Sequence, residues 1–310
     1  MSSWKRLGRF EVLTNPFLML KSRYLVLCAY IVASFVIGLG YAYLGAFQLL
    51  PWNEDDPLSV PVLSIAIWTV LLAIVGRESY RKNLDIQALF GDRTPRFSLS
   101  YAVMLVASAL IFSLGSFSVV FYFLSLGFPD YAAQILESDL LSGGADSQYP
   151  QLYSALMLFL LVIYAPLVEE LIFRGFLLQR WATKWGIRKG LIASSLLFGV
   201  LHINNPVGLT LFGFVMGLLY VRSRSLWIPI VCHSLNNLAA VGIDRLSSWV
   251  SSEPAEAITV ESIQQTWWTG LILIAISAPL LWQFIKRSWP KAQDPIPYLV
   301  NTQLPQHTTE

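Results

Sequence analysis

The sequence predicts an all-α, polytopic membrane helix bundle with about eight transmembrane helices. Of its 310 residues, 55% are hydrophobic and only 13% are charged, and its mean hydropathy is +0.57. An ordinary soluble domain has about 25% charged residues, so this chain needs lipid as its solvent. The bilayer is therefore an expected partner. The net charge of +2 gives no overall basic field of the kind that favours nucleic acid.

Eight apolar segments have the length and polarity expected of membrane spans, since about 20 residues cross a hydrocarbon core of about 30 Å. They are Tyr24–Leu50, Leu58–Val75, Leu99–Phe128, Leu152–Leu178, Gly190–Ile203, Val207–Val221, Leu226–Ile243 and Thr266–Ile285. The fifth and sixth are short, and Asn204, Asn205 and Pro206 form a predicted turn between them. The first follows a basic segment and is too long for a signal peptide, so we expect it to stay uncleaved.

Charge alternates from one connection to the next. The N-terminal segment, the even-numbered connections and the segment after the last span carry Lys and Arg. The first and third connections carry only acidic charges, the fifth has none, and the seventh has Arg245 as its only basic residue. Because positively charged connections stay on the cytoplasmic side, both termini are expected in the cytoplasm. The protein itself is expected in the plasma membrane or another internal membrane.

Ionisable side chains gather in three of the spans. They are costly in lipid and are functional candidates by default, although polar residues also hold helices together. The fourth, fifth and seventh spans contribute Glu169, Glu170, Arg174, His202, His233 and Asn237. This set exceeds what packing needs, so it predicts a polar cavity formed by these spans.

Helical spacing separates the two adjacent acids. Glu170 and Arg174 are four residues apart, which places them on one face as a pair. Glu169 is turned about 100° away and lacks such a partner, which leaves it available for proton transfer. Pro166 removes a backbone hydrogen bond one turn earlier, so we expect the helix to kink just before the acids.

Two further pairs have the same spacing of four residues. Phe198 and His202 share a face of the fifth span, and His233 and Asn237 share a face of the seventh. A histidine beside an asparagine suits the stabilisation of an oxyanion. It also suits a metal site, in which the histidine is the ligand.

Three sequence motifs together resemble a known family. Glu169-Glu170 with Arg174 and a following glycine resembles its EExxxR motif, Phe198 to His202 its FxxxH motif, and His233 to Asn237 its HxxxN motif. The family is the CAAX-processing and bacteriocin-processing (CPBP, or Abi) membrane endopeptidases. All three motifs occur in the family's order, and the resemblance covers about residues 150–245.

The resemblance implies an intramembrane endopeptidase that hydrolyses a membrane-bound or lipidated, for example prenylated, peptide. It assigns water activation to Glu169 and His202, the oxyanion site to His233 and Asn237, and support to Glu170, Arg174 and Phe198. No metal is required in this assignment; the alternative is zinc held by Glu169, His202 and His233. A non-proteolytic membrane scaffold and a proton-coupled transporter remain alternative functions, and the oligomeric state stays open.

These inferences divide the chain into five parts. They are a cytoplasmic segment (1–23), the first three spans (24–149), the CPBP-like catalytic core (150–245), an external loop with the last span (246–285), and a flexible, proline-containing cytoplasmic tail (286–310). Trp181 and Trp185, near the end of the fourth span, are interpreted as interface anchors rather than as substrate contacts.

Overall fold

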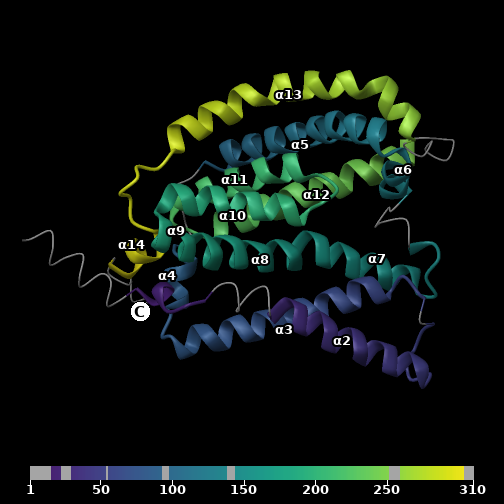
Figure 1. Ribbon diagram of the computed structural model, residues 1–310, viewed down its shortest axis with the longest axis horizontal. Helices are drawn as coiled ribbons and strands as arrows, with labels where there is room; N and C mark the ends of the chain where they lie inside the picture. The colour runs from purple at the N-terminus through teal and green to yellow at the C-terminus, as the bar shows by residue number, and fades with distance from the viewer. Residues whose placement is uncertain are drawn as a thin grey trace, which may run out of the picture.

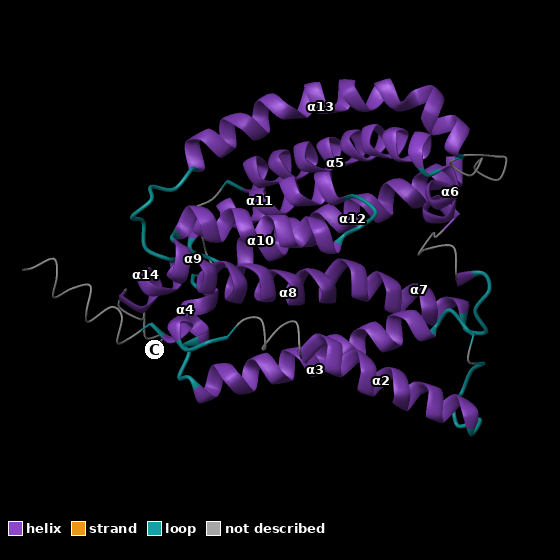
Figure 2. Ribbon diagram, in the orientation of Figure 1, coloured by secondary structure: helices purple, strands orange, loops and turns teal. Residues whose placement is uncertain are grey.

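The computed structural model describes residues 15–21, 29–53, 55–92, 98–137, 144–250 and 259–303, and all regular secondary structure within them is helical (Figure 2). The helices are η1 (Pro16–Leu18), α2 (Ala29–Ala46), α3 (Ser59–Arg81), α4 (Ile86–Phe90), α5 (Leu99–Gly127), α6 (Pro129–Glu137), α7 (Pro150–Phe159), η4 (Leu160–Tyr164), α8 (Ala165–Glu170), η5 (Leu171–Leu178), α9 (Gln179–Trp185), α10 (Ile187–Leu201), α11 (Pro206–Ser223), α12 (Trp227–Val250), α13 (Val260–Ser288) and α14 (Pro297–Gln303).

The predicted polytopic helix bundle is confirmed. Six helices in the described part are long and apolar enough to cross a membrane: Ala29–Ala46, Ser59–Arg81, Ser100–Gly127, Pro150–Trp185, Pro206–Ser223 and Val260–Ser288. The predicted seventh span corresponds to a shorter apolar stretch, Trp227–Ile243. The predicted fifth corresponds to α10, which has 15 residues. Helix α10 is therefore shorter than the six long helices, whereas α12 has 24 residues, of which Trp227–Ile243 is the apolar part.

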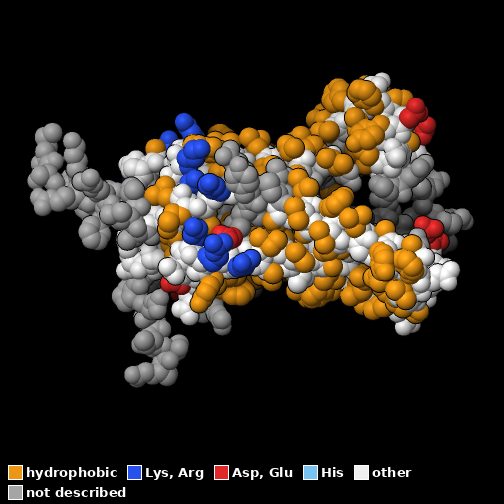
Figure 3. All heavy atoms as spheres, turned by 60° about the horizontal axis from the view of Figure 1, so that its bottom comes forward, with side chains coloured by type: hydrophobic (Ala, Val, Ile, Leu, Met, Phe, Trp, Pro, Cys, Tyr) orange, Lys and Arg blue, Asp and Glu red, His pale blue; other side chains and the backbone are white. Residues whose placement is uncertain are grey.

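A continuous rod from α7 to α9 runs through the middle of the bundle (Figure 1). In that view α2 and α3 lie on one side of the rod, and α10, α11, α12, α5 and α13 lie on the other. Hydrophobic side chains cover most of the face in Figure 3, and Lys and Arg gather toward one end of it. This surface fits a molecule whose flanks face lipid and whose basic end faces water.

Small residues let two of the long helices approach closely. A Cβ atom added to Gly115 of α5 would lie 2.6 Å from the backbone oxygen of Gly270 on α13, and the reverse holds for a Cβ on Gly270. Such contact through small residues is the usual way in which membrane helices pack, because lipid supplies no hydrophobic drive between them. It fixes α13 against α5 on the side away from the central rod (Figure 1).

The central rod changes its helical register around Pro166. The segment η4 is a π-helix, in which the Ala165 amide donates to the Leu160 carbonyl five residues earlier. Proline has no N–H to continue this pattern, so the Leu161 carbonyl lacks its helical donor. The α-helical turn α8 and a second π-helix, η5, follow. Pro166 therefore marks a register change just before the two glutamates, where a kink was expected.

The C-terminal segment differs from the flexible tail that its prolines and polar residues suggested. Tyr298 in α14 is buried and packs edge-on against Phe17, with ring centroids 5.2 Å apart. The Asn301 amide donates to the carbonyl oxygens of Ala88 and Arg224, at 2.8 and 2.9 Å. Apolar and amide side chains therefore tie α14 to the body over residues 297–303, and both described ends lie at the same end of the bundle (Figure 1).

Candidate active site

Glu170 is the centre of a buried charge network. Its Oε1 accepts hydrogen bonds from Arg174 Nη1 and from His233 Nδ1, each at 2.8 Å, while Arg174 Nη2 donates to the Gly213 carbonyl at 2.9 Å. Both Glu170 and Arg174 are almost fully buried. The network joins α8, η5, α11 and α12, so the predicted Glu170–Arg174 pair also positions the imidazole of His233.

Glu169 faces the other side of the same helix turn and lies between two histidines. Its Oε2 is 3.9 Å from His202 Nε2 and 3.8 Å from His233 Nε2. These distances are too long for direct hydrogen bonds, and this buried oxygen has no hydrogen-bond partner among the described residues. The structure thus brings together three side chains from α8, the end of α10, and α12.

The hydrogen bonds of the two histidines fix which ring nitrogen faces Glu169. His202 Nδ1 lies 2.7 Å from the Phe198 carbonyl, which can only accept, so this nitrogen carries the proton. His233 Nδ1 likewise donates to the Glu170 carboxylate. In the neutral form of each ring, Nε2 is therefore a free acceptor directed toward Glu169.

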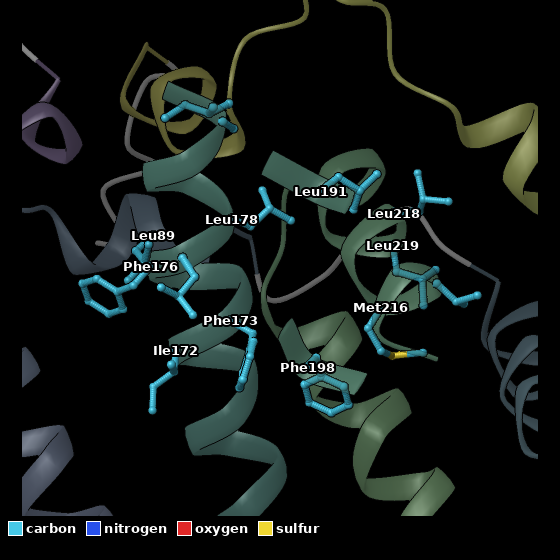
Figure 4. Close-up of a cluster of buried hydrophobic side chains, with 14 of the residues drawn as sticks. Leu89, Ile172, Phe173, Phe176, Leu178, Leu191, Phe198, Met216, Leu218 and Leu219 are labelled. Carbon is cyan, nitrogen blue, oxygen red and sulfur yellow. The ribbon is translucent and has the colours of Figure 1, made fainter. Parts of the chain in front are cut away.

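Phe198 packs among the charged groups of the site. Its ring lies 5.0 Å from that of Phe173, edge to face, and 4.4 Å from that of His202. The guanidinium of Arg174 sits 4.8 Å from its centroid, within the range of a cation–π contact. Figure 4 shows Phe198 and Phe173 on facing helices. The aromatic residue of the FxxxH motif thus supports both Arg174 and His202.

Asn237 has a partner that the sequence did not indicate. Its Nδ2 donates to the Leu161 carbonyl at 2.9 Å, the group that Pro166 leaves without a helical donor. The amide keeps a second N–H for another acceptor. Its oxyanion role remains a prediction, and the structure adds a link between α12 and η4.

A cleft of about 820 Å³ opens beside Glu169 and His202. Its walls come from α2, α3, η5, α9 and α10, and they include Trp68, Leu71, Ile172, Phe173, Leu197 and Leu201. At one end the lining includes Lys21, Arg180, Trp181, Lys184 and Trp185. The two tryptophans thus line the cleft, although their sequence positions suggested interface anchors.

Sequence spacing contains a signal for these lining residues. Glu169, Phe173, Leu177 and Trp181 follow one another at intervals of four, and Lys184 follows three residues later. Intervals of three and four define one face of a helix. From the sequence alone, this spacing could have indicated that the site extends from the EExxxR motif to these lining residues. The Gly213 and Leu161 carbonyls could not have been found this way, because backbone partners leave no mark in the sequence.

Comparisons with known proteins match the segment of the chain that contains this site. Residues 151–239 match the family model described as type II CAAX prenyl endopeptidase, Rce1-like. The resemblance inferred from the three motifs is therefore confirmed over this segment, which contains all the predicted site residues. A Bacillus subtilis (strain 168) protein with the printed name "Putative membrane peptidase YdiL" is 31% identical over 88 residues. That alignment covers 28% of this chain and 36% of the relative, and the search of solved structures found no match.

The matches and the apolar helices together define the class of protein. This is an integral membrane protein whose core segment is similar to CAAX-type intramembrane proteases. The apolar helices imply a lipid bilayer as a partner.

Proposed function

We propose that this protein is an intramembrane endopeptidase that hydrolyses a peptide bond of a membrane-associated protein or peptide, prenylated substrates included. The observation that carries the proposal is Glu169 Oε2, which has no hydrogen-bond partner among the described residues and faces two histidine Nε2 atoms beside the cleft that Glu169 and His202 line. A carboxylate and an imidazole facing one point can take a proton from a water bound there.

The distances around Glu169 suit one bridging water. A water oxygen about 2.8 Å from each of two atoms 3.9 Å apart makes an angle of about 90° between them, which is acceptable for hydrogen bonding. In the proposed step Glu169 or His202 takes a proton from this water, and the oxygen bonds to the substrate carbonyl carbon. Collapse of the tetrahedral intermediate breaks the C–N bond, and the stored proton moves to the leaving amine.

The proposed oxyanion role of His233 needs a proton on its Nε2. Since Nδ1 donates to Glu170, only the doubly protonated ring can donate from Nε2. The Glu170 carboxylate stabilises such a positive ring electrostatically. With Glu169 and Glu170 ionised and Arg174 and His233 positive, the buried cluster has no net charge. Asn237 would add its second N–H to the same oxyanion.

Zinc is a second candidate because of how the histidines are held. In metal sites the ring nitrogen away from the ion usually donates to a carbonyl or carboxylate, as His202 and His233 do here. The ligands would be Glu169, His202 and His233. Bonds of about 2.0–2.1 Å in a tetrahedron hold ligand atoms about 3.3 Å apart, closer than the 3.8 and 3.9 Å seen here. As placed, these residues do not fit zinc, and no group of three or more His, Cys, Asp or Glu within the described ranges has metal-binding geometry.

The proposal is tested by proteolysis in proteoliposomes with a library of prenylated and unmodified peptides. Glu169→Gln should lower kcat by at least about 100-fold and leave the folded protein intact, whereas Glu261→Gln, an exposed control on α13, should not. Activity that survives a strong chelator supports the glutamate mechanism, and loss that zinc restores supports the metal alternative. Absence of cleavage by folded wild-type protein contradicts the proposal and favours a scaffold or a proton-coupled transporter.

A further inference from the structure

Three helix ends meet away from the cleft: the start of α10, the end of α11 and the end of α13. Arg188, in the first turn of α10, donates from Nε to the Pro290 carbonyl at 2.8 Å. Arg222, in the last turn of α11, donates from Nη1 to the Ser288 hydroxyl at 3.1 Å. Two arginines from different helices are therefore held on one short segment, residues 288–290, where α13 ends. None of these residues lines the cleft beside Glu169.

Trp289 lies in the middle of this segment and contacts both neighbouring helices. The Arg188 guanidinium is 5.7 Å from the centroid of its ring, within the range of a cation–π contact. Phe214 of α11 lies 5.8 Å from the same ring, between centroids. Trp289 nevertheless stays 37% exposed. Tryptophan is enriched where a membrane helix meets the lipid headgroups, so these contacts hold Arg188 at headgroup level.

The positive charge of this junction is not compensated by carboxylates in the described part of the chain. Neither Arg188 nor Arg222 forms an ion pair there. Three further basic residues without such a pair flank the segment: Lys286, Arg287 and Lys291. The nearest acid in sequence, Asp294, accepts a hydrogen bond from the Lys291 backbone amide at 2.8 Å. The junction therefore carries an excess of positive charge.

Exposed apolar side chains continue from these basic groups along two helices. On α10, three exposed residues follow Arg188 at intervals of four: Ile192, Leu196 and Val200. On α13, exposed side chains recur at intervals of four and three: Trp282, Lys286 and Trp289. Such intervals place residues on one face of a helix. Each face thus has a positive group near the helix end and apolar groups farther in, the same order as the head and tails of a phospholipid.

We propose that Arg188 and Arg222 together bind the phosphate of an anionic phospholipid at the junction of α10, α11 and α13. A guanidinium has five N–H donors in a planar fork that matches phosphate oxygens. Each arginine uses one of them on segment 288–290, which leaves the others for the lipid. The positive-inside rule explains basic residues at this end in general. It does not explain why two of them are fixed on one segment, as a defined headgroup site requires.

Lipid titration of the full-length protein in detergent, followed by native mass spectrometry, tests this site without relying on cleavage. The probes are dioleoyl-phosphatidylglycerol, which is anionic, and dioleoyl-phosphatidylcholine, which has the same tails and no net charge. We expect the anionic lipid to bind about tenfold more tightly. The combined substitutions Arg188→Gln and Arg222→Gln should reduce its binding to the level of phosphatidylcholine and leave phosphatidylcholine binding unchanged.

The matched control is Lys189→Gln, which removes an exposed positive charge next to Arg188 and should keep the preference for the anionic lipid. Arg188→Lys with Arg222→Lys keeps both charges but removes the forks, so its preference should be intermediate. This pair also tests the site if the glutamine pair fails to fold. In nanodiscs, phosphatidylglycerol should raise the melting temperature of the wild type and of Lys189→Gln above that in phosphatidylcholine, but not that of the glutamine pair.

Several outcomes would overturn the inference. Equal binding of the two lipids to the wild type would do so, as would a preference that survives in the glutamine pair. A preference lost equally in Lys189→Gln would show that general surface charge, and no defined site, attracts the lipid. If the arginine variants melt lower by the same amount in both lipids and keep the preference, the two arginines are only structural. Stabilisation by inorganic phosphate or glycerol 3-phosphate equal to that by phosphatidylglycerol would make this a site for small anions instead of a lipid.

Discussion

Glu169 and Glu170 are neighbours in sequence but differ in environment. Glu170 is bound by Arg174 and His233, whereas Glu169 Oε2 has no hydrogen-bond partner in the described part of the chain. The sequence could predict the Glu170–Arg174 pair because its geometry is local to one helix. It could not predict that His233 joins the pair, because that contact depends on how α12 packs against α8. The chemical roles of these residues remain predictions.

The two acids should respond differently to the same substitution. Glu170→Gln leaves the buried guanidinium of Arg174 without its counter-charge, which costs about 3 kcal/mol or more. We expect a clearly lower melting temperature in detergent. Glu169→Gln removes no hydrogen bond seen in the structure, so its melting temperature should stay close to that of the wild type. Equal melting temperatures for the two variants would contradict the assigned structural role of Glu170.

Asp56 lies outside the membrane-spanning helices and predicts how the stability of the folded protein depends on pH. Burial of its carboxyl acts to raise the pKa, but hydrogen bonds from the Leu58 and Gln148 amides and the Ser147 hydroxyl outweigh it and lower the pKa overall. A lowered pKa in the folded state adds stability at pH values above the unfolded value of about 3.9. That stability is lost as the pH falls through the folded pKa.

Thermal unfolding of the wild type and Asp56→Asn across pH 3 to 7 measures this contribution. We expect the variant to melt at a lower temperature at pH 7, and the difference to shrink as the pH drops below about 4. Ser147→Ala should give a smaller effect with the same pH dependence, since it removes one of three donors. If the difference in melting temperature does not change with pH, the charge of Asp56 is not what holds it to Ser147 and Gln148.

At the scale of the element, the π-helix η4 is tied to the active-site helix α12. The sequence indicated that Pro166 frees a carbonyl, but not which one, because this depends on the register. An α-helical register would free the carbonyl of Val162, whereas the π register frees that of Leu161. Asn237 fills this position. A motif residue that the resemblance assigns to the oxyanion site thus also holds the helix that carries Glu169.

A double-mutant cycle tests this connection. Asn237→Ala should lower the melting temperature, because the Leu161 carbonyl loses its donor, with a cost of about 1–3 kcal/mol. Pro166→Ala restores a backbone N–H in the same register. The cost of Asn237→Ala should therefore be smaller in the Pro166→Ala background. Additive effects of the two substitutions would show that Asn237 and Pro166 act independently.

At the scale of the whole molecule, hydropathy predicted the helix bundle and most of its spans. It could not predict how α14 packs, because the buried contacts of Tyr298 and Asn301 come from distant segments and their prolines resemble those of a linker. It marked the fifth and sixth spans as short; α10 has only 15 residues, whereas α11 has 18 and is long enough to cross a membrane. The expected five-part division of the chain stays a prediction.

The orientation of the bundle can be tested by labelling. We expect the end with η1, α9 and α14 to face the cytoplasm, because its connections carry the positive charges. With Cys28 and Cys232 replaced by alanine, Lys189→Cys should react with an impermeant maleimide only in inverted vesicles. Asp130→Cys, near the start of α6 at the other end, should react only in right-side-out cells. The opposite pattern would contradict the predicted orientation.

The shortness of α10 has a consequence for the surrounding membrane. Its 15 residues extend about 22 Å, less than a hydrocarbon core of about 30 Å, while Val200, Leu201 and Ile203 at its tip are more than half exposed. This hydrophobic mismatch favours local thinning of the bilayer around the α10–α11 hairpin. Because His202 caps α10, the length of the lipid acyl chains should affect its position. Turnover should therefore be higher in short-chain than in long-chain phosphatidylcholine. The protein should also partition into the thinner regions of a mixed membrane.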